Sequence, residues 1–300
     1  MLRSAVIGCG FMGELHCKTY HAIDSVEFAG VYDIDGNRAL EIATKYRTKY
    51  FPNVNDLLGN VDIASIAVPT LFHYDMAIKC INKGINMLME KPLAANLNEA
   101  YEIVKKAQAK NLINSVGYIE RFNPSVIQLL KLVNGQKLLY IETERHAPLS
   151  NRANDVSVVF DLLIHDIDII LSAVKSDVAD IKARGYKRIL PVIDDVVAQL
   201  YFKNGVIAKL SSRKNADKKS RIIKIRSENS YFEADLIAKT IIIEYSGGEH
   251  KKIQCFGKEP IMEEILDFIS AVENKTKPCV SFSEALKSLE IASNIEAIAK

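Results

Sequence analysis

The clearest chemical signal in the sequence lies near the start of the chain, where glycines follow the spacing G-x-G-x-x-G. A short apolar run leads directly into Gly8, Gly10 and Gly13. In this pattern the first glycine permits a tight turn, the second lets a pyrophosphate approach the backbone, and the third lets a helix pack on the strand. Free N–H groups at the start of that helix bind phosphate oxygens. The pattern predicts a dinucleotide site, with Phe11 and Met12 also contacting the cofactor.

An acidic residue stands where such a site needs one. A second apolar run ends just before Asp33, 20 residues after Gly13. An acid at this position accepts hydrogen bonds from the adenosine ribose hydroxyls and repels a 2′-phosphate. We therefore expect NAD as the cofactor, although the nearby Arg38 leaves NADP possible. The alternative interpretation, a tight turn without a ligand, leaves Asp33 unexplained.

Two later apolar runs also end in residues suited to a ligand site. One run ends in Ala-Val-Pro and the other in Glu-Lys-Pro. Ligands bind at the carboxyl ends of parallel strands, and proline turns the chain away from the sheet there. We expect the Lys91 ammonium to point toward this cleft; the alternative is a solvent-exposed surface lysine. The further candidates for cofactor contact are Pro69, Thr70, His73, Glu90 and Lys91.

A nearly all-apolar helix predicted over residues 157–172 carries a narrow polar stripe. At 100° per residue, Asp161, His165 and Asp168 fall within about 60° of one another, whereas Asp166 lies on the other side. Burying an acid and an imidazole without partners is unfavourable, so these groups must pair internally or line a cavity. We interpret the stripe as facing a site, with a structural buried histidine as the alternative. Asp161 and His165 could bind a metal, but no third ligand stands out, and we predict no metal.

Apolar runs alternate with helical patterns through residues 1–119. Strands that are apolar on both faces and separated by helices are typical of a parallel sheet covered on both sides. We predict a Rossmann domain of the α/β class over 1–119, with a doubly wound parallel sheet. The expected strands are 2–7, 26–32, 63–68, 86–89 and 113–116, and the expected helices are 12–23, 36–46, 73–83 and 97–110.

Beyond residue 119 the pattern changes to long strands separated by turn signals such as Asn204-Gly205. These signals favour antiparallel hairpins. We predict an α+β domain over 120–300 with a large, mostly antiparallel open sheet, one face of which needs helices or a second subunit to cover it. The expected strands are 138–145, 178–186, 196–202, 206–212, 222–227, 230–234, 240–245 and 251–255, with helices at 124–132, 157–172, 260–274 and 282–299.

Composition narrows the class of protein further. The 300-residue chain has a formal net charge of +2, which gives no reason to expect nucleic acid or a membrane surface as a partner. No apolar run approaches a membrane span, and the N-terminus lacks the apolar core of a signal peptide. The five cysteines form no C-x-x-C pair, which favours a reducing compartment. We expect a cytoplasmic protein.

Taken together, the glycine loop, Ala67-Val68-Pro69, Glu90-Lys91-Pro92 and the Asp161-x3-His165 pair resemble the Gfo/Idh/MocA oxidoreductases. The resemblance covers nearly the whole chain. It implies that Lys91, Asp161 and His165 form the catalytic group. It also implies a Rossmann domain followed by an α/β domain whose open sheet often serves oligomerisation, so a homodimer or homotetramer is expected.

Two segments, 117–124 and 145–168, are most similar to the members of that family that oxidise carbon 3 of UDP-N-acetylglucosamine. This similarity implies hydride transfer from a sugar ring carbinol to NAD. The candidates for binding the nucleotide diphosphate are Arg121, Asn123, Arg145 and Arg152, since arginine matches phosphate geometry, although surface ion pairs are the alternative. Two other functions stay open: a dehydrogenase of a free polyol or sugar such as an inositol, and a non-catalytic NAD(P)-binding regulatory protein.

Overall fold

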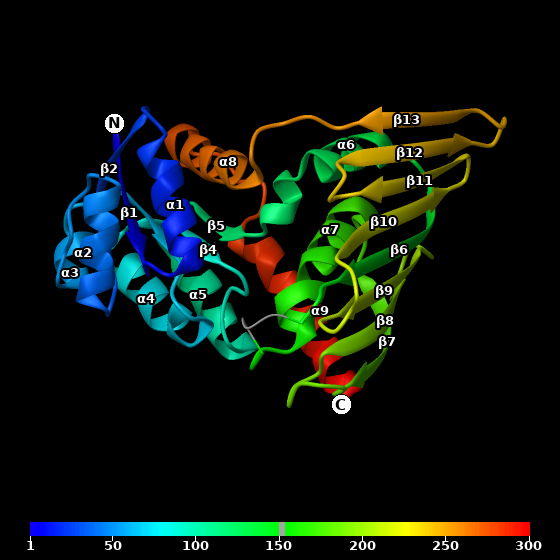
Figure 1. Ribbon diagram of the computed structural model, residues 1–300, viewed down its shortest axis with the longest axis horizontal. Helices are drawn as coiled ribbons and strands as arrows, with labels where there is room; N and C mark the ends of the chain where they lie inside the picture. The colour runs from blue at the N-terminus through cyan, green and yellow to red at the C-terminus, as the bar shows by residue number, and fades with distance from the viewer. Residues whose placement is uncertain (150–153) are drawn as a thin grey trace. The chain divides into compact units, whose positions relative to one another are not determined.

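The computed structural model describes residues 1–149 and 154–300, which divide into two compact units. The first unit comprises Met1–Ile119 and Ile261–Leu286, and the second comprises Glu120–Pro260 and Lys287–Lys300. The single boundary expected after residue 119 therefore needs a correction, because a segment near the C-terminus returns to the first unit. Figure 1 shows this return in the red-brown helix α8 (Pro260–Asn274) beside the blue α1 (Phe11–His21).

The first unit is built on a five-stranded parallel sheet with strand order β2-β1-β3-β4-β5. The order reverses direction between β1 and β3, and such a switch point is where ligands bind in open α/β sheets. This confirms the expected Rossmann class. The strands are β1 (Leu2–Ile7), β2 (Val26–Tyr32), β3 (Ile63–Ile66), β4 (Asn86–Glu90) and β5 (Asn114–Gly117).

Helices pack against the sheet and complete its core. The apolar side of α8 enters the same buried cluster as α1 and the sheet, with Ile265, Phe268 and Ile269 packed near Tyr20 and Val6. This shared core explains why α8 belongs to the first unit. The remaining helices here are α2 (Gly36–Lys45), α3 (Val54–Leu58), the 3-10 turn η1 (Thr70–Phe72), α4 (His73–Lys83) and α5 (Leu97–Ala109).

The second unit contains an eight-stranded sheet in the order β13-β12-β11-β10-β6-β9-β8-β7. Every pairing is antiparallel except that of β6 with β9, which is parallel. The large, mostly antiparallel sheet is therefore confirmed. Its strands are β6 (Leu138–His146), β7 (Val178–Tyr186), β8 (Asp195–Phe202), β9 (Ile207–Arg213), β10 (Ser220–Ser227), β11 (Ser230–Asp235), β12 (Thr240–Tyr245) and β13 (His250–Gln254).

Helices lie along this sheet, as Figure 1 shows for the green α6 and α7. They are α6 (Pro124–Val133), α7 (Ile164–Val174) and the later part of α9 (Phe282–Ala299); the 3-10 turn η2 (Ile119–Phe122) precedes α6. The helix expected over 157–172 begins instead with a π-helical turn, η3 (Val159–Leu163), and becomes α-helical only from Ile164. In the described parts of the chain, no helix is both long and apolar enough to cross a bilayer.

Candidate functional site

The glycine loop after β1 has the geometry that a pyrophosphate needs. Gly8 has φ +94°, and a Cβ there would lie 2.7 Å from the Ala67 carbonyl oxygen, so only glycine fits this turn. A Cβ on Gly13 would lie 1.8 Å from the Gly8 oxygen. At Gly10 an added Cβ meets nothing within 4 Å, which leaves open space at the N-terminus of α1. The loop and the helix start therefore fit a dinucleotide phosphate.

Two neighbours of the glycine loop can contact the rest of the cofactor. Phe11 opens α1 with 59% of its surface exposed, and Met12 is partly exposed. Asp33 follows β2, and its carboxylate accepts hydrogen bonds from the backbone N–H of Cys9 at 2.6 Å and of Asp35 at 2.9 Å. These bonds fix Asp33 against the glycine loop, where a ribose would lie.

The turn after β3 differs from the expected arrangement at His73. Pro69 and Thr70 remain at the carboxyl end of the strand, where they were predicted. His73 is buried, with Nδ1 2.9 Å from the Pro92 oxygen and Nε2 3.0 Å from the Val68 oxygen. Burial lowers the pKa of its imidazole although both carbonyls favour the charged form. Both ring nitrogens thus face backbone oxygens, and we reassign His73 from cofactor contact to holding the two turns together.

Glu90 ends β4 and Lys91 follows it, and the two side chains lie in contrasting environments. Lys91 is partly exposed, whereas Glu90 is 8% exposed and its carboxylate lies 3.0 Å from His16 Nε2. Because its carboxylate is committed to the interior, Glu90 is better described as a buried support for this strand end than as a cofactor contact.

Asp161 lies in the π-helical turn η3, and its partner was not expected from the sequence. The buried ammonium of Lys214 lies 2.8 Å from Asp161 Oδ2 and donates to the Val156 carbonyl oxygen at 2.9 Å. π-helical turns are rare in proteins, and those that occur are often found at functional sites. Lys214 stands just after β9, 53 positions from Asp161 in sequence, and no local pattern in the chain marks it.

The π-helical turn also changes the predicted polar stripe. Regular α-helical spacing does not hold across η3, so the alignment of Asp161 with His165 cannot be derived from 100° per residue. His165 is 9% exposed in the first turn of α7. Asp168, expected beside it, lies 3.3 Å from Arg121 Nη1 through both carboxylate oxygens.

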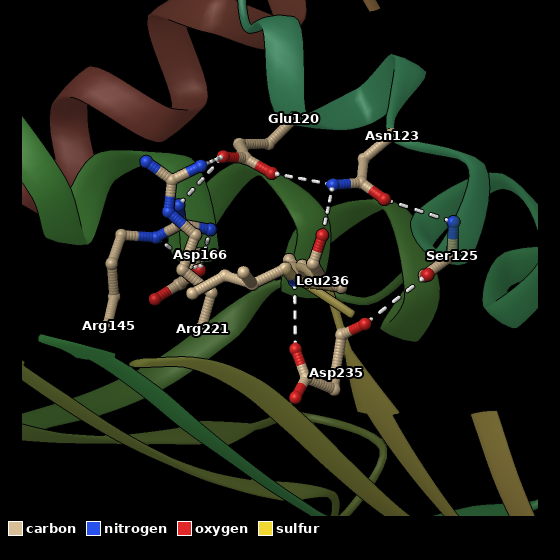
Figure 2. Close-up of polar contacts among 9 residues, drawn as sticks. Glu120, Asn123, Ser125, Arg145, Asp166, Arg221, Asp235 and Leu236 are labelled. Atoms are coloured by element: carbon tan, nitrogen blue, oxygen red, sulfur yellow. Dashed lines mark hydrogen bonds and ion pairs between the residues drawn. The ribbon is translucent and has the colours of Figure 1, made fainter. Parts of the chain in front are cut away.

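Arg145, one of the predicted substrate ligands, belongs to a buried cluster of charged side chains. Figure 2 shows this cluster. Arg145 Nε and Nη2 donate to Asp166 Oδ1 at 2.9 and 2.6 Å, and Nη1 donates to Glu120 Oε1 at 3.1 Å. Arg221 also donates to Glu120. Burial opposes the charge of Arg145, but the two carboxylates outweigh it and raise the pKa of the guanidinium. We reassign Arg145 from phosphate binding to this cluster because it is 2% exposed and three of its five N–H groups already bind Asp166 and Glu120.

The other predicted diphosphate ligands have partners within the fold or lie outside the described residues. Asn123 is 6% exposed; its side chain accepts from the Ser125 N–H as the N-cap of α6 and donates to the Leu236 oxygen. Arg121 is paired with Asp168 as above. Arg152 falls within 150–153, outside the described residues. Among the residues described, no cluster of three or more His, Cys, Asp or Glu side chains is arranged to hold a metal ion.

This geometry defines the class: an enzyme with a dinucleotide-binding Rossmann unit and a second, sheet-based unit carrying acid–base side chains. Residues 2–118 match the model of an oxidoreductase family with an NAD-binding Rossmann fold, and residues 137–231 match the GFO/IDH/MocA C-terminal domain. The chain belongs to the Gfo/Idh/MocA oxidoreductase family, and its first unit is an NAD-binding domain.

The relatives of this chain include enzymes with named sugar and polyol substrates. A UDP-N-acetylglucosamine 3-dehydrogenase from Acidithiobacillus ferrooxidans is 31% identical over 280 residues, covering 90% of this chain and 88% of the relative. A solved structure of that enzyme superposes with a TM-score of 0.95 over 99% of this chain and 97% of its own, at 29% identity. A myo-inositol 2-dehydrogenase from Thermotoga maritima is 24% identical, covering 93% of this chain and 91% of the relative.

Proposed function

We propose that the protein is an NAD-dependent dehydrogenase that oxidises a ring carbinol of a nucleotide sugar, with carbon 3 of UDP-N-acetylglucosamine as the expected position. The observation that carries the proposal is the 31% identity to a UDP-N-acetylglucosamine 3-dehydrogenase across 90% of this chain. The retention of Lys91, Asp161 and His165, the catalytic set expected for the family, supports it.

In this proposal the bound nicotinamide supplies a hydride acceptor, and the protein handles the proton. His165 takes the proton from the hydroxyl group as the carbon is oxidised, since an imidazole suits proton exchange near neutral pH. Lys91 donates a hydrogen bond to the same oxygen and stabilises the negative charge that develops there. Asp161 orients a neighbouring hydroxyl or the imidazole, and Lys214, 2.8 Å away, holds its carboxylate in place.

The residues expected from the sequence to bind the nucleotide diphosphate of the substrate are not all available for it. Because Arg145 and Asn123 are buried in structural contacts, the diphosphate cannot be assigned to the full set of four residues. Arg121 and Arg152 remain proposed ligands. The proposed substrate therefore rests mainly on the similarity to the UDP-N-acetylglucosamine 3-dehydrogenase, and less on a phosphate-binding site.

A screen of substrates tests the proposal directly. Purified protein is mixed with NAD or NADP and with UDP-N-acetylglucosamine, its free sugar, other sugar nucleotides or myo-inositol, and the absorbance of reduced cofactor is followed. We expect the highest kcat/KM with UDP-N-acetylglucosamine and NAD. Carbon-3 oxidation is checked by NMR of the product.

The second candidate substrate is a free polyol, and the inositol dehydrogenase relative favours it. A higher kcat/KM for myo-inositol than for every sugar nucleotide would select that alternative. Binding of NAD without turnover of any compound, in a folded protein, would favour a regulatory role instead.

We also propose a homo-oligomer formed through the large sheet, as a homodimer or homotetramer, in a reducing compartment such as the cytoplasm. One side of the sheet presents the exposed Arg226 beside the partly exposed Tyr140 and Tyr231. All five cysteines are free, which suits a reducing compartment. Light scattering after size-exclusion chromatography tests the assembly: a monomer at all concentrations contradicts it.

A further inference from the structure

The carboxylate of Glu90 is held tightly inside the first unit, one residue before Lys91. Its Oε1 lies 3.0 Å from His16 Nε2, and His16 is 1% exposed. On another side, a Cβ added to Gly117 of the paired strand β5 would lie 3.2 Å from this carboxyl group. Glu90 is therefore packed between helix α1 and the backbone of β5, and its carboxylate has little freedom to move.

His16 is itself the middle of a longer buried chain of hydrogen bonds. Its Nδ1 lies 3.1 Å from Ser65 Oγ, and that oxygen lies 3.0 Å from the Tyr20 hydroxyl. His16 and Tyr20 come from α1 and Ser65 from β3. Tyr20 is 1% exposed and Ser65 is fully buried. The chain of contacts therefore runs from Tyr20 through Ser65 and His16 to Glu90, and only the Glu90 end is more than 1% exposed, at 8%.

One arrangement of protons satisfies every contact in this chain. Burial raises the pKa of Tyr20, so the phenol keeps its proton, and within the described residues its partner is Ser65 Oγ. Tyr20 therefore donates to Ser65. In this arrangement the Ser65 hydroxyl donates its one proton to an unprotonated His16 Nδ1. His16 then donates from Nε2–H to the Glu90 carboxylate.

A second buried carboxyl nearby is consistent with this assignment. Both side-chain oxygens of Glu264, on α8, are buried with no hydrogen-bond partner among the described residues. Burial, and then the negative charge of Glu90, raise the pKa of Glu264 well above its ordinary value. A protonated Glu264 adds no second negative charge beside the Glu90 carboxylate.

We propose that His16 is a positioning residue for Lys91: it fixes the Glu90 carboxylate, and with it the strand end from which Lys91 extends. The inference rests on the proposed function of Lys91. Because the hydrogen-bond chain ends at a buried tyrosine, it serves as an anchor and does not lead protons to solvent. Displacing a catalytic group by about 1 Å can lower a rate by about 10²-fold, so an anchor of this kind affects turnover.

Two substitutions at His16 separate anchoring from simple packing. His16→Gln keeps an N–H group near the position of Nε2 and can still donate to Glu90, whereas the shorter His16→Asn cannot reach it. We expect His16→Asn to lower kcat by about 10-fold to 10²-fold and His16→Gln to stay within about threefold of the parent. The KM for the sugar and the Kd for NAD should change little in both. His21→Asn, at an exposed position of the same helix, is the matched control.

Two measurements do not depend on turnover. Nitrogen NMR of protein labelled in histidine should find a proton on His16 Nε2, the atom that faces Glu90; an Nε2 without a proton overturns the assignment. The rate at which an amine-reactive reagent labels Lys91, read by mass spectrometry, should change in His16→Asn but not in His16→Gln. Equal labelling rates in the parent and both variants overturn the positioning role.

These results also separate the inference from the proposed function. If the parent is inactive but still shows the Nε2 proton and the altered Lys91 labelling, the proposed function is wrong and the positioning role of His16 stands. If the parent is active and His16→Asn leaves its kcat unchanged, the positioning role of His16 is wrong and the proposed function stands. Should both variants fail to fold, as judged by circular dichroism, the NMR result on the parent and the kcat of Ser65→Ala decide: an unchanged kcat there contradicts the inference.

Discussion

At the scale of single residues, His165 is the group on which the proposed chemistry depends most directly. It lies in the first turn of α7, 9% exposed and close in sequence to the π-helical turn that carries Asp161. A positioned general base contributes about 10²–10⁴-fold to a rate. We expect His165→Asn to lower kcat by about that factor and to leave the Kd for NAD nearly unchanged. In the parent, the oxidation rate should fall as the pH drops and the imidazole binds a proton; the variant should lose this acidic limb.

His146 is the natural control for that prediction. It lies at the end of β6, where its Nε2 is 3.1 Å from Ser211 Oγ, and burial and then the charge of Arg213 lower the pKa of its imidazole. His146 is the general base if His146→Asn abolishes the fall in oxidation rate at low pH while His165→Asn keeps both the parent's rate and that fall. If neither variant changes the rate, the base is Lys91 or water.

Asp33 determines the expected choice between the two nicotinamide cofactors. Its carboxylate faces the glycine loop through the Cys9 N–H and would lie close to a 2′-phosphate. Two negative charges about 4 Å apart repel each other by about 1–4 kcal/mol near a protein surface. We therefore expect NAD to have the higher kcat/KM in the parent, and Asp33→Asn to shift the ratio toward NADP by about tenfold or more. Steady-state kinetics with both cofactors checks this, and a parent that prefers NADP contradicts it.

At the scale of elements, the Glu120–Arg145–Asp166 cluster holds η2, β6 and α7 together inside the second unit. Removing one member of a buried ion pair leaves an uncompensated charge and costs about 3–5 kcal/mol. We expect Arg145→Met to lower the free energy of unfolding by about that amount. Lys137→Ala breaks the exposed pair with Glu228 and should leave the denaturation midpoint nearly unchanged. Equal midpoints for the two variants would show that the cluster is not stabilising.

The elements themselves were largely predictable, because glycine spacing, turn residues and apolar runs are local signals. The exceptions have physical causes. The π-helical turn η3 replaces a regular α-helical start without a residue type that marks it. The parallel pairing of β6 with β9 joins strands that are far apart in sequence, and turn residues specify only neighbouring hairpins.

The candidate site was predictable only in part, because local sequence signals do not specify tertiary partners. Residue type and spacing indicate what a side chain can do, but not which partner reaches it first. Arg145 has the chemistry of a phosphate ligand, yet Glu120, 25 positions away, and Asp166, 21 positions away, bind it in the fold. Lys214 was missed because its link to Asp161 depends entirely on tertiary structure.

At the scale of the whole molecule, Glu264 makes stability depend on pH. Burial raises the pKa of its carboxyl in the folded protein, so between the ordinary value near 4.3 and the raised one the folded state binds the extra proton. This contribution to stability is therefore lost as the pH rises through that window, by at most about 1.4 kcal/mol per pH unit. The lowered pKa of His73 acts in the opposite sense, since stability falls as the pH drops below about 6.5.

Glu264→Gln isolates the carboxyl contribution because glutamine does not titrate. The difference in unfolding free energy between variant and parent should grow in favour of the variant between about pH 5 and about pH 8. Denaturant titrations at several pH values measure it. A difference that stays constant with pH would show that the folded and unfolded carboxyl groups ionise alike.

The return of residues 261–286 to the first unit limits how this enzyme can be recombined with its relatives. A chimera joined once, after residue 119, would inherit α8 from the parent that supplied the second unit. Ile265, Phe268 and Ile269 would then have to pack against a foreign nucleotide-binding core. Exchange of cofactor specificity by transplanting a whole unit therefore requires two separate inserts, and the shorter one encodes α8.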